Sequence, residues 1–177
     1  MRTFSPPSIL TSTDVAWNRL ISTSIVLGQS SNPEADSIPR YQVSLVDIGD
    51  QNLGRMDVHI RSQRPIGSNT SPPLLRPYTL DFAATSNASP IRVGVDPWFE
   101  GQFILRADAE AVVEGEQDQI HDPAGMGRHR NVQFTRSESS SVEGSVAWEG
   151  GSLENDADVG IGRLLVRASG ATARLLL

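Results

Sequence analysis

Histidine, carboxylate and arginine side chains gather in one stretch in the second half of the chain. His121, Asp122 and His129, with Asp118 nearby, have the residue types of a two-histidine, one-carboxylate site for a divalent metal ion. The intervening residues 123–127 contain two glycines and a proline, and nothing in the sequence fixes the second ring nitrogen of either histidine. We therefore predict no metal site and no cofactor.

Arginine in the same stretch indicates a second kind of chemistry. Arg128, His129 and Arg130 are consecutive, and guanidinium groups hold phosphate or carboxylate groups through paired hydrogen bonds. With His121 they are the candidate catalytic residues of a small enzyme acting on an anionic or sugar substrate. The alternative is a solvated loop, in which these arginines and Arg136 balance the nearby acidic residues Glu110, Glu114, Glu116 and Asp118.

Two adjacent aromatic residues are the candidate ligand-binding residues. Trp98 and Phe99 follow Asp96 and Pro97 in a predicted turn, so the two rings point in different directions. An exposed Trp98 would give a lectin-like protein a stacking surface for a sugar, or offer an anchor to a partner chain. The alternative is a half-buried ring that plugs the turn. Trp148 alternates with Val146 and is predicted to lie in the core.

Other catalytic patterns are weak in this sequence. His59 alternates with the apolar residues Val58 and Ile60, so we expect its side chain on the opposite face of a strand. The chain has no Gly-x-Ser-x-Gly nucleophile motif. A group of carboxylates lies in a glycine-flanked segment, where nothing predicts the burial that acid–base catalysis needs: Glu154, Asp156 and Asp158.

Composition excludes several classes of protein. The 177 residues suit roughly one domain, and the chain contains no cysteine and no lysine. Disulfide scaffolds, cysteine zinc sites, Walker A lysines and lysine Schiff bases are therefore excluded. The net charge of −6 argues against nucleic-acid binding, because a general binder needs a basic face.

The apolar segments are too short for a membrane span or a secretory signal. Residues 24–27 form one of the longest, and a span needs about 20 apolar residues. The first seven residues have no apolar run of the kind found in signal peptides. We therefore predict a cytoplasmic protein, with unconventional secretion as the alternative.

The first 39 residues are rich in Ser, Thr and Pro and are predicted to form an irregular segment that packs on the domain. Val15, Leu20 and Ile21 do not alternate, which favours a short helix capped by Thr13 or Asp14. From Tyr41 onwards apolar residues recur at every second position, the period of a β-strand. Residues 40–177 are therefore predicted to form a single domain.

Short alternating runs separated by Gly, Pro and Asn turns predict an all-β domain. The architecture is expected to be a β-sandwich or a short-stranded β-solenoid. The closing residues 174–177 are apolar after Arg174 and are expected to form a strand inside the fold. The alternating runs begin at Val43, Met56, Leu80, Ile91, Phe103, Ala111, Val132, Val146, Leu164 and Ala173.

One part of the pattern resembles a known family. The motifs are Thr85-Ser86-Asn87 after a strand, the alternation from Ile91 to Val95, Phe99-Glu100-Gly101 before the next strand, and Gly144 to Trp148. Residues 78–177 resemble a family of unknown function from mushroom-forming fungi, whose units pack as a small β-solenoid or β-sandwich. Asn87 is followed here by Ala88 where that family has glycine, and the resemblance implies no catalytic residues.

For function, we predict a non-enzymatic binding or structural module. The exposed edges of a short-stranded β fold invite pairing with a protein partner or with a second copy of the chain. The small enzyme and the lectin-like glycan binder described above are the alternatives. A small anionic compound or a glycan is the expected ligand if one binds.

Overall fold

The computed structural model describes residues 9–16, 20–27, 40–47, 54–62, 79–115, 122, 127–149 and 162–177. Every regular element in this part of the chain is a β-strand, which confirms the all-β prediction. The first six strands are β1 (Ile9–Ala16), β2 (Leu20–Leu27), β3 (Arg40–Asp47), β4 (Arg55–Ser62), β5 (Thr79–Ser86) and β6 (Ile91–Val95). The other six are β7 (Gly101–Ala107), β8 (Ala111–Glu114), β9 (His129–Glu138), β10 (Ser141–Glu149), β11 (Gly162–Ala168) and β12 (Ala173–Leu176).

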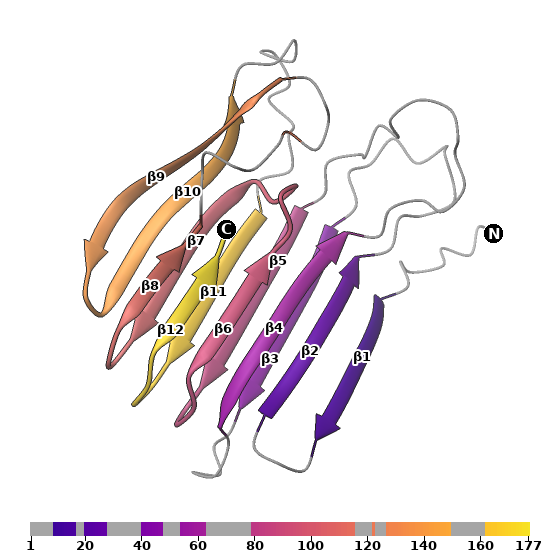
Figure 1. Ribbon diagram of the computed structural model, residues 1–177, viewed down its shortest axis with the longest axis vertical. Helices are drawn as coiled ribbons and strands as arrows, with labels where there is room; N and C mark the ends of the chain where they lie inside the picture. The colour runs from indigo at the N-terminus through magenta and orange to yellow at the C-terminus, as the bar shows by residue number, and fades with distance from the viewer. Residues whose placement is uncertain are drawn as a thin grey trace, which may run out of the picture.

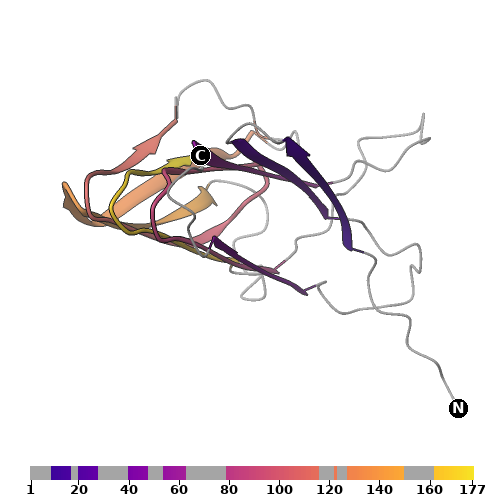
Figure 2. The ribbon, with the colours of Figure 1, turned by 90° about the horizontal axis from the view of Figure 1, so that it is seen from below.

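The strands form two six-stranded sheets that pack as two layers (Figures 1 and 2). Sheet A has the strand order β1-β2-β4-β6-β12-β8, and sheet B has the order β3-β5-β11-β7-β10-β9. Two facing sheets with one buried side each are the arrangement of a β-sandwich.

Strands β3 to β8 alternate between the two sheets, as do β11 and β12, and the resulting units stack on one another. We call each pair β3–β4, β5–β6, β7–β8 and β11–β12 an arch, because its first strand lies in sheet B and its second in sheet A. Neighbouring arches pair in parallel in both sheets. The arch β11–β12 closes the sequence, yet it lies between β5–β6 and β7–β8 (Figure 1). Its C-terminal strand is thus inside the fold, as predicted.

The turns of adjacent arches are bonded to one another. The buried hydroxyl of Ser86 accepts a hydrogen bond from the amide of Ser89 at 2.9 Å, which closes the turn after β5. The carbonyl of Ser86 accepts a bond from the amide of Ser169 in the next arch at 2.8 Å. The Asp108 carboxylate in turn accepts a bond from the amide of Gly170 at 2.8 Å. These bonds satisfy backbone groups that the strands leave unpaired.

Register places the alternating apolar residues in rows across each sheet. In sheet A, Val58, Val93 and Leu175 are neighbours on adjacent strands, and all three are fully buried. In sheet B, Phe82, Leu164 and Phe103 form the facing row, with at most 2% of each exposed. The core therefore consists of stacked apolar rows, because alternation puts every second side chain between the sheets.

Antiparallel hairpins extend the stack at its two ends. The hairpin β1–β2 adds to sheet A beyond β4, and the hairpin β9–β10 adds to sheet B beyond β7. The strands at the sheet edges are thus β1 and β8 in sheet A and β3 and β9 in sheet B. The predicted boundary at residue 40 stays a prediction, although β2 pairs with β4 along its whole length.

The predicted N-terminal helix is wrong, because the residues around Thr13 and Asp14 belong to strand β1. Thr13 pairs with Thr23, and Asp14 pairs with Ser22 in β2. Both strands are rich in β-branched residues, which lose side-chain freedom in a helix and fit a pleated sheet. Among the described residues no helix is long and apolar enough to cross a membrane.

Candidate functional site

Trp148 is the centre of a cluster of charged side chains at one end of sheet B. It lies near the end of β10, is 8% exposed, and pairs with Arg130 at the start of β9. The guanidinium carbons of Arg128 and Arg130 lie 5.5 Å and 6.0 Å from the Trp148 ring centroid. Both distances are in the range of cation–π attraction, and tryptophan is the aromatic residue that binds cations best.

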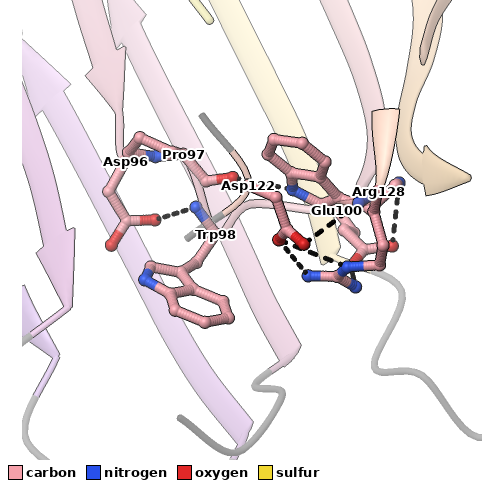
Figure 3. Close-up of polar contacts among 7 residues, drawn as sticks. Asp96, Pro97, Trp98, Glu100, Asp122 and Arg128 are labelled. Carbon is pink, nitrogen blue, oxygen red and sulfur yellow. Dashed lines mark hydrogen bonds and ion pairs between the residues drawn. The ribbon is translucent and has the colours of Figure 1, made fainter. Parts of the chain in front are cut away.

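Two carboxylates, Asp122 and Glu100, pair with Arg128 (Figure 3). Arg128 donates to one Asp122 oxygen from Nε at 3.3 Å and from Nη2 at 3.1 Å, and its backbone amide donates to the other oxygen at 3.1 Å. Its Nη1 lies 3.6 Å from Glu100 Oε1. The side chains of Arg128 and Asp122 are only 12% and 4% exposed, so this is a largely buried, fork-like ion pair.

Hydrogen bonds lock the turn before β7 against the same tryptophan. Trp148 Nε1 donates to the carbonyl of Pro97 at 2.9 Å, and its backbone amide donates to Glu100 at 3.4 Å. The Asp96 side chain accepts a bond from the amide of Trp98 at 3.1 Å, as Asx turns do (Figure 3). The turn is therefore held by its own hydrogen bond at Asp96 and by the hydrogen bonds from Trp148 in β10.

The environment of Glu100 favours its protonated form. Burial raises the pKa of the Glu100 carboxyl, and the nearby Asp122 carboxylate adds to this increase. The hydrogen bond from the Trp148 amide and the charges of Arg128 and Arg130 act in the opposite direction, but they do not outweigh the loss of water. The net result is a pKa of the Glu100 carboxyl above its ordinary value.

The cluster joins four separate segments of the chain. Residue 122, the turn at 96–99, the first residues of β9 and the end of β10 all contribute, and Glu100 stands just before β7. Arg128 donates hydrogen bonds to Asp122 and forms an ion pair with Glu100, and its guanidinium group lies over the ring of Trp148. The arrangement is suited to holding these segments in place, because Arg128 is paired with both Asp122 and Glu100.

No family model, curated protein or solved structure matches the chain. The resemblance to the fungal family stays a prediction.

The structure brings together two of the four predicted catalytic residues. Arg128 and Arg130 both lie against Trp148, whereas His129 is exposed and pairs with Glu149 in the neighbouring strand. Alternation explains the separation, because consecutive strand residues point to opposite faces. His121 lies outside the described residues, as do Asp118, Glu154, Asp156 and Asp158.

Arg136 is not part of this cluster. It forms an exposed pair with Glu138 at 2.8 Å in the distal half of β9. Sequence reasoning had grouped it with Arg128 and Arg130, and it missed Glu100 as their partner. The period-two alternation of Trp148 did predict its burial, but not the charged neighbours, which come from distant parts of the chain.

The two aromatic candidates for ligand binding have different environments. Phe99 is 1% exposed and belongs to the core, so its ring presents no face to a ligand. Trp98 is half-buried and donates its amide to the Asp96 turn (Figure 3). Trp98 is therefore the residue of this pair with ring surface left for stacking.

Residues that could bind a metal ion do not gather at one place within the described part of the chain. No group of three His, Asp or Glu residues there could hold a metal ion. Asp122, one of the ligands considered from the sequence, is engaged by Arg128. His59 lies half-buried on the outer face of β4, where its Nδ1 would be 3.1 Å from a Cβ atom at Gly94.

Proposed function

We propose that the chain is a non-enzymatic assembly module that pairs with a second copy of itself through strand β3. The observation that supports this proposal is the position of β3 at the edge of sheet B, where β5 is its only strand neighbour among the described residues. The free side of such a strand presents unpaired N–H and C=O groups, which are a template for another strand.

The residues of β3 suit strand addition. It is eight residues long, contains no proline, and carries its charged residues, Arg40 and Asp47, only at its ends. Val46 on its outward face is 65% exposed, the highest value among the exposed large apolar side chains of the described residues. Proteins that protect an edge strand do so with central charges, prolines or bulges, and β3 has no central charge and no proline.

A two-fold axis through the middle of β3 would let both copies keep their cores. Antiparallel pairing about Val43 or Ser44 places the inward residues of one copy beside the inward residues of the other. Tyr41, Val43 and Leu45 would then continue the apolar side of a joined sheet, while Gln42, Ser44 and Val46 would stay on its outer side. Such a contact is closed and self-complementary, as in most soluble dimers.

The internal pairing of the Trp148 cluster supports a non-enzymatic role. Arg128 is held by Asp122 and Glu100, and His129 points away from it. The small enzyme built on His121, Arg128, His129 and Arg130 stays the alternative. A lectin-like role has one specific observation in its favour, the incomplete burial of Trp98.

Sedimentation equilibrium of the purified full chain tests the assembly proposal. We expect the wild-type protein to dimerise and Ser44→Arg to be a monomer, because the two new charges would lie near each other across the axis. Leu165→Arg is the matched control, since Leu165 is 41% exposed on the outer face of β11 in the interior of the same sheet. This variant should dimerise like the wild type.

A wild-type protein that stays monomeric at all concentrations would contradict the proposal. Equal dimerisation of the Ser44→Arg and Leu165→Arg variants would contradict it as well, because the contact would then lie elsewhere. Circular dichroism of each variant establishes that it is folded before its mass is interpreted.

A further inference from the structure

A pocket of about 400 Å³ opens on the outer face of sheet A, whereas Trp148 lies in sheet B. Three arginines from three adjacent strands line it: Arg55 of β4, Arg92 of β6 and Arg174 of β12. Pro90, Ile91 and Thr172 are the other lining residues in the described part of the chain, and none of these six residues is acidic. Figure 1 shows the three strands side by side.

The register of the sheet explains why the arginines converge. Arg92 and Arg174 are direct neighbours on adjacent parallel strands, and Asp57 is the neighbour of Arg92 on its other side. Adjacent strands lie about 4.8 Å apart, so the two guanidinium groups leave the sheet close together. The residues next to these arginines along each strand point to the opposite face, and Ile91 and Leu175, for example, are buried in the core.

The space between the arginines comes from shorter residues two positions earlier in the chain, Pro90 before Arg92 and Thr172 before Arg174. Met56 donates its amide to the carbonyl of Pro90 at 2.8 Å, and Ile91 donates to the carbonyl of Thr172 at 3.0 Å. These bonds place Pro90 beside the start of β4 and Thr172 beside the start of β6, and neither Pro90 nor Thr172 carries a long side chain. The floor of the pocket is thus a hydrogen-bonded backbone, which fixes the positions from which the arginines project.

Only two of the three positive charges have a carboxylate partner. Arg55 donates to Asp57 at 2.7 Å and 2.9 Å, and Arg174 donates to Glu114 at 2.6 Å. Arg92 has no ion pair among the described residues, and its Nε is buried without a hydrogen-bond partner. Within the described residues, three arginines against two carboxylates leave one uncompensated positive charge, and it lies on the middle strand, β6.

Exposed side chains leave the flanking arginines free to move. The side chains of Arg55 and Arg174 are 47% and 46% exposed, and each guanidinium has donors beyond those it uses for its carboxylate. They can therefore turn toward an anion held above Arg92. Pockets for small molecules begin at about 300 Å³, so this one has room for a compact ligand.

We propose that this pocket binds a small compound through a phosphate or carboxylate group, with Arg92 as the central contact and Arg55 and Arg174 as flanking contacts. Guanidinium groups form paired hydrogen bonds with both kinds of oxyanion, which is why arginine predominates where such groups are recognised. The overall charge of −6 does not oppose such binding, because the local charge decides it.

Isothermal titration calorimetry on the full chain at low ionic strength tests this site, with inorganic phosphate and succinate as the two probes. We expect saturable binding of at least one of them, and the better probe identifies the source of the oxyanion. Arg92→Gln should weaken that binding about tenfold or more, because it removes charge-assisted hydrogen bonds from the centre of the site. Arg163→Gln is the matched control, since it removes the same charge from an exposed position of sheet B.

Nuclear magnetic resonance gives a second readout that does not depend on the stability of one variant. The amides of Ile91 and Thr172 should shift on titration with the bound probe, whereas the amide of Arg163 should not. If Arg92→Gln does not fold, Arg174→Gln takes its place. Absence of saturable binding of both probes would overturn the proposal, and so would equal binding by the pocket variant and by Arg163→Gln.

Discussion

Gly101, at the start of β7, and Gly162, at the start of β11, are paired in adjacent strands with their backbones almost in contact. A Cβ atom at Gly101 would lie 2.6 Å from the carbonyl carbon of Gly162, and Gly101 has a φ of +151°. Side chains cannot be accommodated here, because both the space and the backbone conformation require glycine. The close approach lets the inserted arch β11–β12 pair with β7.

Replacement of Gly101 by alanine should therefore be severely destabilising. We expect Gly101→Ala to lower the free energy of unfolding by about 2–4 kcal/mol, the sum of overpacking and backbone strain. Gly127→Ala separates the two causes, because Gly127 has a φ of +71° but nothing within 4 Å of its Cβ position. It should cost about 1–2 kcal/mol. Urea unfolding measures the free energy of unfolding of both variants. Equal losses in the two variants would mean that the contact with Gly162 carries no cost.

Alternation in the sequence predicted the strands from β3 onwards and the buried faces of most of them, but it missed β1 and β2. Leu80, Phe82 and Ala84 alternate within β5 and are 0–2% exposed, and Trp148 is buried as its spacing predicts. Period-two alternation determines the side of a strand that faces the core, but it carries no information on which strand lies beside it. The position of β11–β12 between two earlier arches could therefore not be predicted.

The candidate sites were harder to predict than the strands. Arg128 and Arg130 were identified from their residue types, but Glu100, in the turn before β7, and Trp148, in β10, are brought near them only by the fold. The arginine pocket was missed for the same reason. Arg92 and Arg174 are 82 positions apart in sequence, and their adjacency follows from the inserted arch.

The raised pKa of Glu100 predicts a pH dependence of stability. Since the folded state holds the Glu100 proton more tightly than the unfolded chain, the stabilisation is present below the ordinary glutamate pKa of about 4.3 and is lost as pH rises through the raised value. Glu100→Gln cannot titrate. The unfolding temperature of the wild type minus that of Glu100→Gln should therefore fall as pH rises from about 4 to 7. A difference that stays constant or rises across this range would refute the assignment.

The ion pair of Arg128 with Asp122 should show strong coupling. Arg128→Gln leaves a nearly buried Asp122 carboxylate without its main partner, so we expect a loss of about 3–5 kcal/mol in the free energy of unfolding. Adding Asp122→Asn should restore part of this loss, because the buried charge is then removed. Arg136→Gln, which breaks an exposed pair, should leave the unfolding midpoint almost unchanged. Additive losses in the double variant would show that the pair is not coupled.

The inserted position of β12 predicts that the last strand is essential for the fold. Leu175 is fully buried between β6 and β8, so Leu175→Ala should cost about 2–5 kcal/mol through lost apolar burial and the cavity left behind. Leu165→Ala, on the exposed face of β11, should cost far less. Deleting residues 175–177 should prevent folding, because β6 and β8 would lose the strand that joins them in sheet A. Circular dichroism during heating measures all three. A truncated chain that melts cooperatively within a degree or two of the wild type would show that sheet A closes without β12.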